Sequence, residues 1–352
     1  MPYFSAMQIR PVLSAALTAV VAATTLTAMA RPAQAANNAQ TCSRQVTMRG
    51  YSDALDKTTY QGAFVGDLSS LTTDRRGSLF ALSDRSKVFT LDHQFRPAAV
   101  TSLADEQGRA LDSEGLAVER NGDFLVTSEL EPSVRRFDQQ GRLLGRLPVP
   151  DTFQVTPDGH GILNRTLEGL TLDRGGRTLV AAMEGWLTSD GMNTRRFQTW
   201  ERHGRHDFQL ARQWAYTAEP GYGISEIAAT GDGRYLALER SFAAKVGWTA
   251  KLYLADPRGA TDTSDMQALA NDQPGVRFAK RTLLADLSGT CPSLGAVSHI
   301  PSQANPLIGN IEGMTIVGRE PGGRLRLLMT TDDGESASEI TRLYHVTVRL
   351  PH

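Results

Sequence analysis

The stretch DSEGLAVERNGDFLVTSE at residues 112–129 decides the fold of this chain. It reads as an acidic residue, a short apolar strand, a turn that contains glycine, a second apolar strand and a closing acidic residue. The same order returns at residues 168–184, 226–240 and 312–333. An earlier copy at 69–85 has Ser69 where the others have glutamate. Five copies of one hairpin indicate a repeat architecture.

Each hairpin is followed by enough chain for two more strands. After the hairpin at 112–129, alternating apolar and polar residues at 133–138 predict a third strand, and residues 143–149 predict a fourth. Four antiparallel strands in about 40 residues are typical of one blade of a β-propeller.

The spacing of the copies predicts the number of blades. Ser69, Glu114, Glu168, Glu226 and Glu312 are separated in turn by 45, 54, 58 and 86 residues. The last interval has room for a degenerate extra blade, with strands near 251–254 and 276–284. We therefore predict an all-β propeller of six blades with four antiparallel strands each, while five or seven blades also fit. An N-terminal strand is expected to complete the last sheet and remove its open edge.

The first 35 residues are expected to lie outside the propeller. Arg10 is the only charged residue before an apolar run at 12–30, and Ala33-Gln34-Ala35 offers the small residues that a signal peptidase reads. A membrane anchor is the alternative, but threonines within the run favour cleavage. We predict a signal peptide at 1–35 and a propeller domain at 43–352. The mature chain would be a secreted or periplasmic monomer without a membrane span.

Charge and cysteine content limit the partners and the compartment. The formal net charge of −1 points neither to nucleic acid nor to an anionic membrane surface. Cys42 and Cys291 are the only cysteines. In an exported protein a lone pair favours a disulfide over two free thiols. Such a bridge would attach the N-terminus to a late blade.

Short motifs within the repeats resemble those of a known family. They are Leu68-Ser69 with Asp84-Arg85, Asn164-Arg165 before Glu168, Tyr216 before Ser225-Glu226, Glu239-Arg240, residues 310–313, and Asp332-Asp333 followed by Thr341-Arg342-Leu343. On these motifs the sequence resembles the family called esterase-like activity of phytase, from residue 50 to the C-terminal strand. The resemblance implies a hydrolase that acts on a small phosphate or carboxylic ester.

The repeated acidic residues are the candidate site. Opening glutamates begin the strand nearest the propeller axis and closing acids end its antiparallel partner, so both sets are expected at one mouth of the channel. Crowded carboxylates raise one another's pKa unless a cation lies among them. Calcium suits such a site because it takes about six to eight oxygen ligands. The predicted metal ligands are Glu168, Glu226, Glu312, Asp84 and Asp333.

The predicted catalytic residues complete this site. A phosphate ester would be repelled by bare carboxylates, so arginines must help to bind it. Arg85 and Arg240, which directly follow closing acids, are the predicted anion donors. Glu114 or Glu239 is the predicted acceptor of a proton from water.

A purely structural interpretation of the glutamates remains open. Each one can accept hydrogen bonds from backbone N–H groups of the next blade and so hold two blades together. Strand alternation supports this, because Glu114, Leu116 and Val118 would share the face that packs on a neighbouring blade. The protein is therefore either a metal-dependent hydrolase of phosphate esters or a non-catalytic propeller that binds a ligand or protein in the cell envelope.

Other catalytic motifs are weak. Arg202-His203-Gly204 and His206-Asp207 resemble parts of the histidine acid phosphatase signature, but that chemistry needs the two parts far apart. We interpret residues 201–207 as a solvated turn. The sequence contains neither a G-x-S-x-G elbow nor an S-x-x-K motif, so only the resemblance supports a serine esterase.

Overall fold

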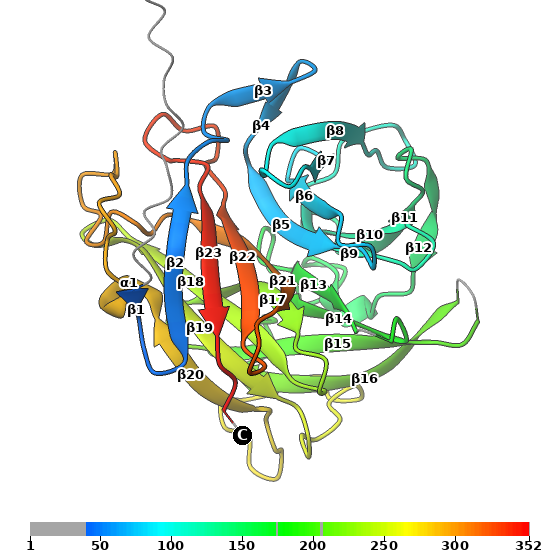
Figure 1. The fold of residues 1–352 in the computed structure, drawn as a ribbon. Coiled ribbons are helices and arrows are strands. Elements are labelled where there is room, and N and C mark those ends of the chain that lie inside the picture. Colours follow the sequence, from blue (N-terminus) through cyan, green and yellow to red (C-terminus); the bar gives the residue numbers. More distant parts are fainter. Residues whose placement is uncertain (1–39, 174, 205–206, 352) are drawn as a thin grey trace, which may run out of the picture. The chain divides into compact units, whose positions relative to one another are not determined.

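The computed structural model describes residues 40–351 except 174, 205 and 206 (Figure 1). The predicted signal peptide at 1–35 lies outside these residues. Nearly all regular structure within them is β-strand, with two short helices, η1 (Asp151–Phe153) and α1 (Leu287–Thr290). Among the described residues, no helix has the length and apolar character needed to cross a membrane.

Five antiparallel sheets follow one another along the chain, and each has the strand order of a propeller blade (Figure 1). Blade 1 comprises β5 (Leu68–Thr73), β6 (Leu79–Ser83), β7 (Lys87–Leu91) and β8 (Pro97–Ser102). Blade 2 comprises β9 (Ser113–Val118), β10 (Phe124–Ser128), β11 (Ser133–Phe137) and β12 (Leu143–Leu147). Blade 3 comprises β13 (Leu167–Leu172), β14 (Thr178–Met183), β15 (Thr194–Arg202) and β16 (Phe208–Thr217).

The last two blades contain the C-terminal strands and the N-terminal ones. Blade 4 comprises β17 (Gly223–Ala229), β18 (Tyr235–Ala243), β19 (Gly247–Asp256) and β20 (Lys280–Asp286). Blade 5 comprises β21 (Ile311–Arg319), β22 (Leu325–Thr331), β23 (Leu343–Val348), β2 (Val46–Ser52) and β1 (Gln40–Thr41). A separate hairpin of β3 (Thr58–Tyr60) and β4 (Ala63–Val65) precedes blade 1.

The innermost strands β5, β9, β13, β17 and β21 contact one another in this order, and β21 contacts β5 to close the ring. The predicted all-β propeller is therefore confirmed, but the prediction of six blades was wrong, since the sheets form five. The strands expected in an extra blade are β19 and β20, which belong to blade 4.

Two long loops account for the interval that had suggested a sixth blade. The loop at 257–279 joins β19 to β20 and lies along β16, where Ala279 N–H donates to the Ala215 carbonyl at 2.8 Å. Thr263 N–H likewise donates to the Gln213 carbonyl at 3.1 Å. The second loop, at 291–310, leads from α1 to β21. The extra length therefore covers an outer strand instead of forming a new sheet.

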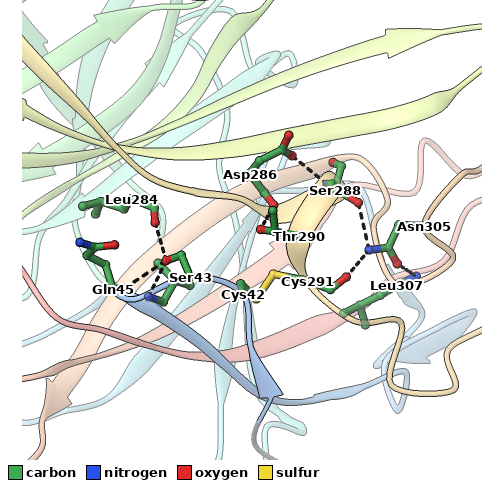
Figure 2. The surroundings of a disulfide bond; sticks show 12 residues. Cys42, Ser43, Gln45, Leu284, Asp286, Ser288, Thr290, Cys291, Asn305 and Leu307 are labelled. Atoms are coloured by element: carbon green, nitrogen blue, oxygen red, sulfur yellow. Dashed lines mark hydrogen bonds between the residues drawn. A yellow bond between two sulfur atoms is a disulfide. The ribbon is translucent and has the colours of Figure 1, made fainter.

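The N-terminal strand closes the ring, as predicted. Strand β2 pairs with β23, so blade 5 contains both ends of the described chain. The predicted disulfide between Cys42 and Cys291 is also confirmed, with 4.2 Å between the Cα atoms (Figure 2). Beside it, Ser43 Oγ donates to the Leu284 carbonyl at 2.6 Å. These contacts attach the closing strand to blade 4 as well as to blade 5.

The apolar core is divided among the five gaps between neighbouring blades. Five separate clusters of buried residues each combine residues from two adjacent blades. Between blades 3 and 4, for example, Phe197 stacks on Trp214 with 3.8 Å between ring centroids, and Tyr235 of blade 4 packs on Trp214. Burying an aromatic side chain contributes about 2–3 kcal/mol. The apolar side chains thus hold blades together and leave the channel to polar residues.

Candidate functional site: an acidic mouth of the central channel

A β-bulge near the start of each innermost strand decides which side chains enter the channel. The bulge lies at Ser69 in β5, at Ser225 in β17 and at Glu312 in β21. In β9 and β13 it falls at residues 114–115 and 168–169. An extra residue reverses the alternation of side chains that follows it. The expectation that Glu114 and Leu116 share one face was therefore wrong, because only Leu116 packs between blades 1 and 2.

The bulges place five residues in equivalent positions, which we call the inner ring. Its members are Ser69, Glu114, Glu168, Ser225 and Glu312. A second set of equivalent residues, the outer ring, pairs with the residue two positions before each inner-ring residue; its members lie directly after the second strand in four blades and within β18 in blade 4. Its members are Asp84, Glu129, Glu184, Arg240 and Asp332. In blade 4 the ring positions are Ser225 and Arg240. Each is one residue away from the acid that the sequence pattern had predicted there, Glu226 or Glu239.

Glu226 therefore does not belong to the inner ring but occupies the place of Gly115, Gly169 and Gly313. A Cβ atom at Gly169 would lie 2.7 Å from the backbone nitrogen of Ile227, so this position faces the next blade closely. The buried Glu226 carboxylate accepts hydrogen bonds from Ser70 Oγ of blade 1 and from the backbone N–H groups of Leu170 and Ile227. Burial raises the pKa of this carboxyl well above its usual value. Glu226 therefore has the structural role considered above for the repeated glutamates: it accepts hydrogen bonds and holds neighbouring blades together.

Glu239 is also held away from the rings. Its carboxylate accepts hydrogen bonds from the Tyr216 hydroxyl at 2.5 Å and from the backbone N–H of Glu219 at 2.8 Å. Arg281 lies 3.4 Å from the same carboxylate. Glu239 therefore links blades 3 and 4 and does not face the channel acids.

Three of the predicted acids do converge. Carboxylate oxygens of Glu114, Glu168 and Glu312, from three different blades, all lie within 4.8 Å of one another. Glu114 also forms such a group with Asp112 and Glu129. The three central side chains are buried, with residue exposures of 8, 3 and 5%. This buried set of three carboxylates is the centre of the acidic mouth.

Arg240 lies inside the acidic mouth. Its Nη2 atom is 2.7 Å from Glu312 Oε1 and 3.3 Å from Glu168 Oε1, and its Nη1 atom is 3.4 Å from Glu184 Oε1. Its guanidinium also lies over the ring of Trp248, 5.7 Å from the centroid. The Nε–H donor of Arg240 is buried and has no acceptor in the described part of the chain. Arg240 therefore has one unused donor within the acidic mouth.

Of the other predicted residues, Arg85 lies at the exposed rim and Asp333 is buried beneath it. The side chain of Arg85 is 63% exposed, and its Nε atom lies 3.2 Å from Asp67 Oδ2 and 3.4 Å from Asp84 Oδ1. Asp333 pairs with Lys57, which precedes the β3–β4 hairpin, and accepts a hydrogen bond from the backbone N–H of Asp67 at 3.0 Å. Asp67, Asp332 and Asp333 form a separate acidic group within 4.8 Å.

The acidic mouth holds more negative charge than its arginines balance. Burial, with the neighbouring carboxylates adding to it, raises the pKa of Glu114 well above its usual value. The same causes raise the pKa of Glu129 to about 8, that of Asp84 to about 7 and that of Asp332 to about 6. Of the described arginines and lysines, none lies within 4.0 Å of the Glu114 carboxylate. A proton or a bound cation is therefore needed to balance Glu114.

The donors at this centre fit a hard cation. All three central groups are carboxylates, and calcium is bound through oxygen in flexible geometry. Asn310 adds a further oxygen: its Nδ2 donates to Glu312 Oε1 at 2.9 Å, while its buried Oδ1 has no partner among the described residues. A buried amide oxygen without a donor is uncommon in folded proteins and fits a bound water molecule or cation.

Several site residues were missed because their positions depend on the pairing register of the first two strands in each blade, which the sequence does not show. Asp332 stands in the outer ring where the sequence had favoured Asp333, since the backbone N–H of Asp332 donates to the Asn310 carbonyl. The same backbone pairing occurs between Glu129 and Asp112 in blade 2. The residue two positions before each inner-ring residue is therefore a second signal, and it is acidic or Asn in blades 1, 2 and 5.

The curated relative and the solved structures that resemble this chain do so at low sequence identity. One curated relative, an "Uncharacterized secreted protein" of Arthroderma benhamiae, is 27% identical over 123 residues, which cover 28% of this chain and only 24% of the relative. Among solved structures, the PQQ-bound aldose sugar dehydrogenase of Streptomyces coelicolor has 12% identity and a TM-score of 0.42, with 88% of this chain and 100% of that chain covered.

A second solved structure and a family model complete the comparison. Glutaminyl cyclase of Myxococcus xanthus has 15% identity and a TM-score of 0.40, with 81% of this chain and 92% of that chain covered. The family model "Phytase-like: Esterase-like activity of phytase" matches residues 63–335, which include the whole of blades 1 to 4 and the strands β21 and β22 of blade 5. The chain therefore belongs to the family described as esterase-like activity of phytase.

Proposed function

We propose that this protein is an exported, cation-dependent hydrolase of phosphate esters and that the acidic mouth is its active site. The observation that carries the proposal is the convergence of Glu114, Glu168 and Glu312 within 4.8 Å, with Arg240 against two of them. Membership of a family described as esterase-like supports an ester as substrate. The disulfide fits an exported protein, because such bonds persist in oxidising compartments.

Calcium is the proposed cation. Glu114, Glu168, Glu312 and the Asn310 side-chain oxygen would hold it. Compared with the predicted ligand set, Glu114 replaces Glu226, and Asp84 and Asp333 are left out because neither lies in the group of Glu114, Glu168 and Glu312. When bound, the cation would polarise a phosphoryl oxygen and lower the pKa of a water molecule. It would also offset the carboxylate charge that otherwise repels a phosphate group.

Arg240 would orient the substrate. Two of its nitrogen atoms are engaged with carboxylates, which fixes the guanidinium, and the buried Nε–H remains for a phosphoryl oxygen. Hydrogen bonds from a charged donor to an anionic oxygen are about twice as strong as neutral ones. Arg85 at the exposed rim would attract the substrate and contact its outer oxygens.

Glu129 is the proposed proton acceptor in place of Glu239. It lies in one group with Glu114 and Asp112, and burial raises its pKa to about 8. A carboxylate with a pKa near the working pH can take a proton from water and return it to the leaving group. All of these residues come from one chain, so a monomer suffices for the proposed reaction.

Assays of three substrates test the proposal. Purified protein with calcium or EDTA is given an aryl phosphate, inositol hexakisphosphate and an aryl acetate. We expect calcium-dependent release of phosphate that is lost in Glu114→Gln. The matched control Glu320→Gln, just beyond the far end of β21, should retain it. Turnover of the acetate alone would indicate a carboxylic esterase, and no turnover at all would favour a ligand-binding propeller.

A further inference from the structure

The central channel has a second mouth at the opposite end. The ends of the five innermost strands, with the turns beyond them, line a cavity of about 320 Å³. Its wall includes Thr72 of β5, Val118 of β9, Thr171 of β13, Ala229 of β17 and Thr315 of β21. We call this cavity the basic mouth, because arginines dominate its rim.

Three arginines line the basic mouth: Arg75, Arg120 and Arg319. Arg120 donates to the Gly175 carbonyl, and Arg319 Nη2 donates to the Thr230 carbonyl at 2.6 Å. Neither Arg120 nor Arg319 has a carboxylate within 4.0 Å among the described residues. Carbonyl groups fix these two guanidinium groups without neutralising their charge.

The two carboxylates that line the same cavity are held by their own turns. Asp74 Oδ1 accepts hydrogen bonds from the backbone N–H groups of Arg76 and Ser78, both at 2.8 Å. Asp173 Oδ1 accepts hydrogen bonds from the backbone N–H groups of Arg177 at 2.6 Å and Thr178 at 3.1 Å. Both aspartates are thus engaged within their own turns, and neither is paired with Arg120 or Arg319.

Hydroxyl groups face the same space. One repeat position holds threonine in three blades, as Thr72, Thr171 and Thr315, and each of these lines the cavity. Thr171 Oγ1 accepts a hydrogen bond from the Ala229 backbone N–H at 3.1 Å, so its own proton remains available. The Thr72 and Thr315 hydroxyls make no hydrogen bond to a described residue. Hydroxyl donors beside uncompensated guanidinium groups are suited to an oxyanion.

The two mouths are separate sites. Between them lies the buried Glu226 carboxylate, which binds Ser70 of blade 1 and Leu170 of blade 3 across the channel axis. A ligand in the basic mouth therefore does not reach the acidic cluster.

We propose that the basic mouth binds a small molecule that carries a phosphate or carboxylate group, with Arg120 and Arg319 as its charged donors. Thr72 and Thr315 would donate from the channel wall. This ligand is distinct from the substrate at the acidic mouth, and the proposal does not depend on catalysis there.

Calorimetric titration of the full chain with inorganic phosphate and with succinate tests the proposal. Divalent cations are first removed with EDTA, and the protein is then exchanged into EDTA-free buffer, because the carboxylates of EDTA would compete for the basic mouth. Without a cation the acidic mouth repels both anions. We expect binding that weakens about tenfold, or about 1.4 kcal/mol, in Arg120→Gln and in Arg319→Gln. Arg96→Gln makes the same charge change in the β7–β8 turn at the outer edge of the same side and should bind normally.

Each outcome decides the matter. Binding of one probe but not the other supports the proposal and identifies the oxyanion. Binding that is unchanged in the Arg120→Gln/Arg319→Gln double variant overturns it, and so does the absence of binding of both probes to the unmodified protein. Thr315→Val keeps the charges and the shape and should weaken binding severalfold, so it tests the site even if the double variant does not fold.

Discussion

Replacement of Arg240 by methionine should destabilise the protein strongly at pH 8 and weakly at pH 5. The guanidinium lies 2.7 Å from Glu312, 3.3 Å from Glu168 and 3.4 Å from Glu184. Removing one partner of a buried ion pair costs about 3–5 kcal/mol, because the remaining charge is buried without compensation. We therefore expect a loss of about 3 kcal/mol in the free energy of unfolding at pH 8.

The pH dependence follows from the raised pKa values of the remaining acids. Burial already holds the pKa of Glu168 and Glu312 above the unfolded value, and loss of Arg240 raises both further. A group with a raised folded-state pKa contributes stability that is complete below its unfolded pKa and is lost as the pH rises through its folded pKa. The charged forms of these carboxyl groups are therefore less populated at pH 5 than at pH 8, so we expect the variant to lose less stability at pH 5.

Urea unfolding in EDTA at both pH values measures this difference. Arg146→Met is the control, because Arg146 pairs with the partly exposed Glu106 and Glu131, and such pairs contribute about 0–1 kcal/mol. An equal loss at pH 5 and pH 8 for Arg240→Met, or a loss no larger than that of the control, would refute the electrostatic account of the acidic mouth.

The remaining predictions concern the cation, the axis and the closure of the ring. Without a cation the protein should lose stability as the pH rises from 5 to 8. Calcium at about a hundredfold excess over its Kd should add about 2.7 kcal/mol to the free energy of unfolding. Melting curves should show this gain as a rise in Tm, and Glu114→Gln should abolish the rise. Glu226→Gln should cost about 1–3 kcal/mol, since the amide nitrogen cannot accept the hydrogen bond that the Ser70 hydroxyl donates to Glu226 Oε2. The calcium shift should persist in this variant, and its loss would place Glu226 in the cation site. Cys42→Ser with Cys291→Ser should cost about 5 kcal/mol by loop closure, and an unchanged urea midpoint would count against that role.

The sequence predicted the class of the fold because the hairpin pattern survives in all five blades. The number of blades was wrong for a physical reason: loops of 257–279 and 291–310 contain no repeat, and one of them packs along β16 by backbone hydrogen bonds. Length alone cannot distinguish a covering loop from a degenerate sheet.

The site was predictable to within one residue. Glu114, Glu168 and Glu312 were placed together correctly because they precede a glycine that packs on the next blade. Glu226 was misaligned because it stands in the place of that glycine, and a bulge at Ser225 cannot be seen in the alternation of side chains. The same one-residue error in alignment applies to Glu239. Arg240 occupies the outer-ring position where Glu239 was expected, so a positive charge stands there instead of an acid.

The most direct test of the proposed function is the initial rate of aryl phosphate hydrolysis by EDTA-treated protein as calcium is added back. We predict a rate that rises from background, saturates with calcium, and does not rise in Glu114→Gln. A rate independent of calcium, or one equally restored in Glu114→Gln, would contradict catalysis at the acidic mouth.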